Sequence, residues 1–298
     1  MARARPKLLL FALLLVAAFW SEGRLPGVLE RWLPPPTATN LPVAQTLPEV
    51  VAPQGPLAAV FEAARPATLR IEARSERSFM PLGVGTGFFF SADGLVLTAF
   101  HVVDRSELPP EFRSGVRYVG VAPDGREYAL ELRGFDAYHD LAVLRAEAGG
   151  PVPFLSLTQA VPGVDSEVLA IGNSRGDFLQ GRVGRVLRLD VESPRARFAE
   201  GTLELSAALS PGDSGGPVLN GAGEAVGVVS FISFNPDASD PPPYLRGVIR
   251  PSYASYAVPV TLGSELLAAL VAGERRDIPV IGLSFPPGSV ANYSPRFS

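Results

Sequence analysis

Short apolar runs separated by turn residues fill the chain from residue 67 to residue 260. Many of them alternate apolar and polar positions over roughly four to eight residues, which is the pattern of a half-buried β-strand. Asp-Gly or Asn-Gly pairs at 93–94, 124–125 and 220–221 separate neighbouring runs, and such pairs favour hairpins between antiparallel strands. The pattern predicts strands over residues 67–73, 84–90, 95–98, 116–122, 128–135, 141–145, 167–171, 183–191, 202–206, 217–219, 225–234 and 256–260.

Helical patterns are few in the same part of the chain. Residues 57–64 (LAAVFEAA) predict one short helix, and residues 262–272 predict another after the last strand. The chain shows no repeat of fixed period and no heptad pattern. The sequence therefore predicts an all-β domain over residues 57–272, closed by a short C-terminal helix.

The first twenty residues have the layout of an export signal. Arg3, Arg5 and Lys7 precede an uninterrupted apolar run over residues 8–20. This run is shorter than the about 20 residues that span a bilayer, which favours a secretory signal sequence. Small residues suited to a signal peptidase are lacking at its end, however, and Trp20 suits an interfacial membrane anchor. A signal sequence and an N-terminal membrane anchor both stay open for residues 1–20, and either one exports the rest of the chain.

Proline marks the segment that follows. Residues 21–56 contain eight prolines. Proline-rich chain does not pack into regular elements and extends by about 3.1 Å per residue. We expect a linker that can hold the folded domain away from a membrane.

Composition removes several function classes. Apolar residues make up 47% of the chain and charged residues 19%, as in a folded globular protein rather than a disordered one. The formal net charge of −4 provides no basic surface for nucleic-acid phosphates. The absence of cysteine excludes disulfides and thiolate chemistry, and the two histidines, His101 and His139, are too few for a dedicated zinc site. We expect neither a metal nor a cofactor.

One glycine-rich motif carries the strongest chemical signal. Residues 210–217 read SPGDSGGP, and the glycines allow a tight turn from which Ser214 projects. In such a turn the backbone N–H groups of Gly212 and Ser214 point toward one spot and form an oxyanion hole. For this motif alone, a glycine-rich surface turn remains the alternative.

Two further motifs add a base and an acid. His101 follows the apolar run LTAF, and Asp140 opens the run LAVL. A serine hydroxyl needs an imidazole to take its proton, and the imidazole needs a carboxylate to fix its tautomer. Asp136 is a rival for the carboxylate, but Asp140 is favoured because it directly opens its strand. The chain order histidine, aspartate, serine is that of the chymotrypsin-type double barrel.

These motifs resemble the bacterial HtrA (Deg) branch of the trypsin-like serine proteases. The similarity extends over roughly residues 57–272 and is most specific in residues 85–103 (GTGFFFSADGLVLTAFHVV), 139–145 (HDLAVLR), 205–230 (LSAALSPGDSGGPVLNGAGEAVGVVS) and 256–259 (YAVP). The resemblance implies two antiparallel six-stranded β-barrels of chymotrypsin type, with the site between them. The lack of cysteine agrees with this branch.

The resemblance also implies roles for single residues. It assigns catalysis to His101, Asp140 and Ser214, with Gly212 and Ser214 binding the oxyanion. It further implies that the substrate-binding positions are Ala208, Leu209, Ser230 and Phe231. Polypeptides are the implied substrates, and assembly into trimers makes a homo-oligomer a further expectation.

The C-terminal residues 273–298 depart from the family pattern. HtrA proteases usually carry PDZ domains after the protease, whereas residues 275–285 (RRDIPVIGLSF) resemble only the connection into such a domain and its first strand. Asp213 also stands where the family often has asparagine. Regulation through a PDZ domain is therefore not implied for the residues that are present.

The function expected from these motifs is a serine endopeptidase that acts through an acyl-enzyme. We expect it in the bacterial periplasm, or anchored to the inner membrane with its catalytic domain outside the cytoplasm. The alternative from another class is a protease-like chaperone or scaffold that binds polypeptides with low or latent activity. Because Ala208 offers no acid to its pocket, cleavage should follow small or medium aliphatic residues, unless Asp237 or Asp240 enters the pocket and favours basic ones.

Overall fold

The computed structural model describes residues 50–174, 178–191, 201–234 and 253–277. The predicted export signal, most of the predicted linker, Asp237, Asp240 and the predicted tail beyond residue 277 lie outside the described residues. None of the helices in these ranges is long and apolar enough to cross a membrane.

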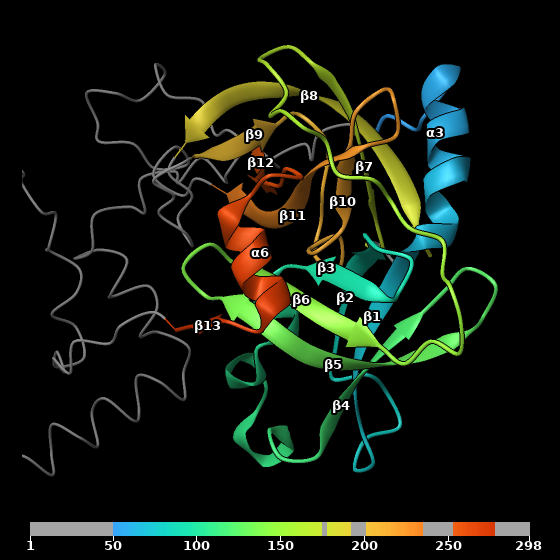
Figure 1. The fold of residues 1–298 in the computed structure, drawn as a ribbon, viewed down its shortest axis with the longest axis vertical. Coiled ribbons are helices and arrows are strands. Elements are labelled where there is room, and N and C mark those ends of the chain that lie inside the picture. The colour runs from blue at the N-terminus through green and yellow to red at the C-terminus, as the bar shows by residue number, and fades with distance from the viewer. Residues whose placement is uncertain (1–49, 175–177, 192–200, 235–252, 278–298) are drawn as a thin grey trace, which may run out of the picture. The chain divides into compact units, whose positions relative to one another are not determined.

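The first half of the described chain forms a short helical segment followed by six strands (Figure 1). Its elements are α3 (Pro56–Ala64), η1 (Arg65–Ala67), β1 (Thr68–Ser75), β2 (Gly83–Phe89), β3 (Leu95–Thr98), α4 (Phe100–Val103), η2 (Arg105–Glu107), η3 (Pro110–Phe112), β4 (Val116–Val121), β5 (Glu127–Asp136) and β6 (Leu141–Ala146).

The second half forms six more strands, one helix and a last short strand. Its elements are β7 (Glu167–Gly172), β8 (Gln180–Val191), β9 (Thr202–Leu205), β10 (Pro217–Leu219), β11 (Ala225–Phe234), β12 (Tyr253–Pro259), α6 (Glu265–Ala272) and β13 (Arg275–Arg276).

The strands close into two barrels, which Figure 1 shows one above the other. The first follows the order β5-β4-β1-β2-β3-β6 and closes through the pairing of β5 with β6, while β13 adds to β5 in parallel. The second is a closed barrel in the order β10-β11-β12-β9-β8-β7. The predicted all-β fold with two antiparallel six-stranded barrels is therefore confirmed.

Turn chemistry explains two of the three predicted hairpins directly. Gly94 and Gly125 have φ angles of 92° and 83°, which a residue with a side chain adopts only with strain. The Asn220-Gly221 pair instead begins a longer loop in which Gly223 takes the positive φ of 81°. There the Asn220 side chain accepts hydrogen bonds from the backbone N–H groups of Ala222 and Glu224, each at 3.0 Å, as asparagine commonly does in turns.

The main differences from the predicted elements lie at their ends. β8 begins at Gln180 rather than at residue 183, and β12 at Tyr253 rather than at residue 256. Helix α6 begins at Glu265 rather than at residue 262, because the Ser264 hydroxyl caps it by accepting from the Leu267 N–H at 3.3 Å. Apolar periodicity does not report such capping.

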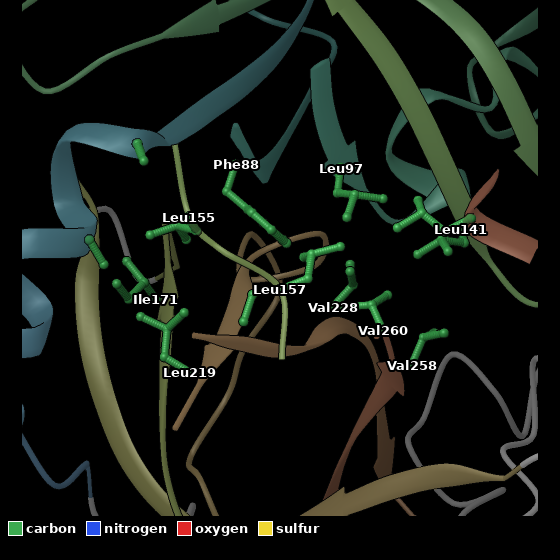
Figure 2. Close-up of a cluster of buried hydrophobic side chains, with 14 of the residues drawn as sticks. Phe88, Leu97, Leu141, Leu155, Leu157, Ile171, Leu219, Val228, Val258 and Val260 are labelled. Atoms are coloured by element: carbon green, nitrogen blue, oxygen red, sulfur yellow. The ribbon is translucent and has the colours of Figure 1, made fainter. Parts of the chain in front are cut away.

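An apolar cluster joins the two barrels (Figure 2). Phe88 and Leu97 from the first barrel lie beside Leu157 of the connecting segment and Val228 of the second barrel, and all four are buried. Helix α6 packs on β5, where a Cβ at Gly134 would lie 2.3 Å from the Leu270 carbonyl oxygen. The cluster includes Leu97 of β3, Leu141 of β6 and Val228 of β11, so the strands next to His101, Asp140 and Ser230 share one core.

The end of the predicted proline-rich linker already contacts the second barrel. The Val51 carbonyl accepts a hydrogen bond from the Val183 N–H at 2.8 Å. The Pro53 ring lies against Gly181, where an added Cβ would come within 2.9 Å of it. The folded part thus begins before residue 56, where the sequence pattern ended the linker, because a proline-rich chain can still lie along a strand.

A chain beginning at Val50 should therefore be more stable than one beginning at Pro56. Both should fold, but the shorter chain loses the Val51–Val183 hydrogen bond and the cover over Gly181, which together contribute about 1–2 kcal/mol. Thermal unfolding of the two truncated chains measures the difference. Equal melting temperatures would show that these contacts do not stabilise the barrel.

Candidate active site

His101 and Asp140 meet where two neighbouring strands end. His101 lies in α4, directly after β3, and Asp140 directly precedes β6, the partner of β3. The buried Asp140 carboxylate lies 2.8 Å from His101 Nδ1 through Oδ2, and its Oδ1 accepts from the His101 backbone N–H at 2.9 Å. This contact favours the tautomer with a proton on Nδ1, which leaves Nε2 able to accept one.

The backbone of Asp140 has an unusual conformation. Its φ is 52°, a left-handed value that costs energy for a residue with a side chain. The Asp140 carbonyl accepts from the Phe100 N–H at 3.1 Å. Backbone and side chain of Asp140 thus both bind the helical turn that carries His101.

The rival acid, Asp136, binds the other histidine. Its Oδ1 accepts from the His139 backbone N–H at 2.8 Å, and its Oδ2 lies 3.1 Å from His139 Nδ1. Burial acts to raise the pKa of Asp136, but the hydrogen bonds from His139 hold it below its ordinary value. Asp136 is therefore paired with His139, and Asp140 is the acid next to His101.

Ser214 lies half-buried on a turn that tolerates only glycine at several positions. Gly212 and Gly215 have φ angles of 105° and 85°. A Cβ on Gly215 would lie 2.1 Å from the Thr86 carbonyl oxygen, and one on Gly216 would lie 2.0 Å from that of Ile171. The glycines therefore let the turn press against both barrels, rather than form a surface loop.

Two backbone N–H groups of this turn have no acceptor within the described residues. Gly215 and Gly216 donate to the carbonyls of Val229 and Asp213, at 2.6 and 3.0 Å. By contrast, the N–H groups of Gly212 and Ser214 donate to none of the residues that the structure describes. Two free N–H groups beside a serine can bind a negatively charged oxygen.

Thr86 holds the turn from the first barrel. Its N–H donates to the Ser214 carbonyl at 2.8 Å, and its hydroxyl donates to the Gly212 carbonyl at 2.7 Å. The sequence pattern missed this residue, since the surrounding glycines at 83, 85 and 87 indicated only close strand packing. A polar residue among such glycines is the signal that could have found it.

Ser230 lies between the carboxylate and the nucleophile. Its hydroxyl donates to Asp140 Oδ2 at 2.5 Å, and its carbonyl accepts from Ser214 Oγ at 3.4 Å. A β-bulge between Val229 and Phe231 in β11 produces this arrangement, as bulges beside active sites often redirect one side chain. Within the described part of the chain, no hydrogen bond joins Ser214 Oγ to His101.

The remaining predicted substrate-binding residues differ in exposure. Ala208 and Leu209 are buried at 2% and 1% exposure, and Phe231 is half-buried. Residues 206–210 include no acidic side chain. An apolar pocket of about 430 Å³ lies elsewhere, beside α6, and none of the predicted site residues lines it. No metal-ligand cluster is present within the described ranges.

Comparison with known proteins identifies the domain. Residues 85–228 match the model of the trypsin-like peptidase domain. This part of the chain is a trypsin-like peptidase domain. It contains every residue of the His101, Asp140 and Ser214 set, and the Ala208, Leu209 and Gly212 positions with them.

The relatives of this peptidase domain confirm the predicted HtrA (Deg) resemblance. HhoA of Synechocystis sp., named as a serine protease, is 30% identical over 206 residues, which are 67% of this chain and 46% of HhoA. A protein of Rhizobium meliloti named as a DegP-like periplasmic serine endoprotease is 28% identical over 204 residues, 66% of this chain and 35% of that protein.

The fold has solved counterparts as well. The serine endoprotease from Yersinia pestis superposes with a TM-score of 0.55 at 22% identity, over 74% of this chain and 68% of that one. This likeness supports the fold of the peptidase domain. The chain spans less than half the length of the two sequence relatives above.

Proposed function

We propose that the chain is a serine endopeptidase that hydrolyses peptide bonds through an acyl-enzyme. The observation that carries this proposal is the hydrogen-bonded His101–Asp140 pair, together with a serine turn in which two N–H groups have no acceptor among the described residues. A peptidase needs a nucleophile, a base and a site for the oxyanion, and these groups supply one of each.

Each group has a defined step in this proposal. Ser214 Oγ attacks the peptide carbonyl carbon while His101 Nε2 takes its proton. The N–H groups of Gly212 and Ser214 bind the resulting oxyanion, and His101 then protonates the leaving amine as the C–N bond breaks. Water then attacks the acyl-enzyme carbonyl while His101 takes its proton, and the carboxylic acid product leaves as Ser214 regains its proton from His101. Asp140 stabilises the imidazolium that forms in both halves.

The resting position of Ser214 is compatible with the endopeptidase and with one alternative function. Its hydroxyl donates to the Ser230 carbonyl instead of to His101, so the nucleophile must turn before it reacts. Catalytic hydrogen bonds are often long or absent without substrate, which agrees with the endopeptidase. A polypeptide-binding chaperone or scaffold with latent activity would show the same contact. Cleavage of an unfolded protein by the purified chain distinguishes the two, since the scaffold would bind it and leave it intact.

The wider context of the proposal comes from the relatives. The name of the Rhizobium meliloti protein places that relative in the periplasm, and the basic and apolar residues 1–20 of this chain support export. We therefore propose a periplasmic or membrane-anchored enzyme that acts on exported or unfolded polypeptides. A homo-oligomer, a trimer by resemblance to the family, belongs to the same proposal.

Cleavage should follow small or medium aliphatic residues. The proposed base of the substrate pocket, Ala208, lies in a segment with no acid, so a bound arginine would bury its charge without a partner. Such burial costs several kcal/mol, whereas valine or alanine loses only water from an apolar surface. Two peptides that differ only in valine or arginine before the cut should differ at least about 100-fold in kcat/KM.

Mass spectrometry of an unfolded protein digested by the chain provides a second readout of the same pocket. Most cuts should follow valine, alanine or leucine. A majority after arginine or lysine would contradict the apolar pocket and would indicate that an acid such as Asp237 or Asp240 reaches it.

A further inference from the structure

The second barrel contains a buried arginine directly behind the nucleophile turn. Arg182 lies in β8 with only 2% exposure and is the largest of the fully buried side chains in the described residues. Its Nη1 lies 3.3 Å from Asp213 Oδ1, and its Nη2 donates to the Ser174 hydroxyl at 2.6 Å. Asp213 is itself fully buried and immediately precedes Ser214.

The Asp213 carboxylate ties the turn to the loop after β7. Its Oδ1 accepts from the Ser174 backbone N–H at 3.0 Å, and its Oδ2 accepts from the Ser210 N–H at 2.9 Å. Ser210 begins the motif, so one side chain holds both the start of the turn and the neighbouring loop. These two bonds, together with the bond from the Thr86 hydroxyl to the Gly212 carbonyl, hold the backbone on both sides of Gly212.

The space around this carboxylate is closed on the side of β7. A Cβ at Gly172 would lie 2.2 Å from Asp213 Oδ1. The carboxylate therefore occupies the volume that a side chain at Gly172 would need. An unpaired charge at this position is relieved either by protonation of the carboxyl or by outward movement together with the backbone of the turn.

Whether the Asp213 carboxylate stays in place depends on its ion pair with Arg182. Burial raises the pKa of the Asp213 carboxyl above its usual range, and the charge of Arg182 opposes this rise. A buried charge that loses its partner is strongly destabilising, whereas replacing both partners together is often nearly neutral. Without Arg182, Asp213 lowers the cost of its unpaired charge by binding a proton or by moving toward water, and either change weakens its hydrogen bonds to the N–H groups of Ser174 and Ser210.

We propose that Arg182 is a positioning residue for catalysis, because its ion pair with Asp213 holds the oxyanion-binding N–H groups of Gly212 and Ser214 in place. This role rests on the proposed function of Ser214 as the nucleophile. Strand β8 carries no residue of the proposed catalytic triad. In this proposal it nevertheless controls the geometry of the nucleophile turn.

The test compares Arg182→Met with Arg185→Met in the full chain. Arg185 lies three residues further along β8 and is exposed, so it is a matched control for loss of one arginine. The rate of fluorophosphonate labelling and the kcat and KM for a peptide are measured well below the melting temperature of each variant. Hydrogen exchange of the peptide covering residues 210–216 reports on the turn independently of activity.

Arg182→Met should lower kcat and the labelling rate at least tenfold, change KM less than threefold, and speed exchange in residues 210–216. Arg185→Met should change none of these measurements by more than twofold. Adding Asp213→Asn to Arg182→Met removes the unpaired charge. The logarithm of the labelling rate should then recover at least half of the decrease that Arg182→Met alone causes.

Arg182→Lys keeps the charge but not the two-armed contact, and it serves as the second variant where Arg182→Met does not fold. It should reduce kcat by less than Arg182→Met and still speed exchange of the turn. The proposal is overturned if a folded Arg182→Met or Arg182→Lys chain shows a lower melting temperature with wild-type kcat and wild-type exchange in residues 210–216. That result would make Arg182 a purely structural residue, and wild-type cleavage would still support Ser214 as the nucleophile.

Discussion

Replacing Ser214 with alanine should lower kcat/KM for an unfolded protein by at least about 10⁴-fold, leaving only what the oxyanion site and substrate binding provide. Folding should be almost unaffected, because Ser214 is half-buried and its hydroxyl makes one long hydrogen bond of 3.4 Å. The Ser214→Ala chain is compared with the wild type by cleavage of casein and by thermal unfolding.

Ser114→Ala provides the control for this measurement. Ser114 is an exposed serine in the loop before β4, so the same chemical change there should leave cleavage at the wild-type rate. Wild-type cleavage by the Ser214→Ala chain would remove Ser214 from the proposed mechanism.

Replacing Asp140 with asparagine should lower kcat by about 10⁴-fold, because an amide can present an N–H group to His101 Nδ1 and favour the wrong tautomer. KM should change little, since Asp140 is buried beneath His101 and does not lie in the proposed substrate pocket. Steady-state kinetics on a peptide with valine before the cut measures both constants.

Asp136→Asn is the matched control for the acid. Asp136 is buried, lies four residues away, and contacts His139 instead of His101. Its replacement should lower the melting temperature but leave kcat within about threefold of the wild type, because its pair lies outside the proposed mechanism. A larger loss of kcat for Asp136→Asn than for Asp140→Asn would reverse the assignment of the acid.

The sequence predicted the strands well because their signals are local. Each barrel strand has one face in a core, so apolar alternation and glycine turns mark it without knowledge of its partners. The candidate triad depends equally on local signals, since His101 lies in the short helix that follows β3 and Asp140 directly precedes the adjacent strand β6. Chain order then selected the double barrel.

The contacts behind the nucleophile turn could not be predicted in this way. Arg182 and Asp213 are 31 residues apart, and an arginine in a strand is ordinarily an exposed residue. Thr86 and Gly212 are 126 residues apart and belong to different barrels. Only the closure of both barrels brings these partners together, and no periodicity in the chain encodes it.

The position of Ser230 shows a second limit. The run over residues 225–234 was correctly predicted as a strand, but strict alternation gives no sign of the bulge between Val229 and Phe231. The bulge directs the Ser230 hydroxyl toward the Asp140 carboxylate, to which it donates a hydrogen bond. A bulge depends on the register with β12, and register is set by the partner strand.

Covalent labelling of the nucleophile distinguishes an activated Ser214 from an inert serine. The full chain is treated with a fluorophosphonate, digested with a protease of known specificity, and the adduct is located by tandem mass spectrometry. We expect one adduct, on Ser214, that forms at least about 100-fold more slowly in the Asp140→Asn chain and is absent in the Ser214→Ala chain. An unlabelled Ser214 in the folded wild-type chain, or an adduct on another serine that persists in Ser214→Ala, would contradict the proposed mechanism.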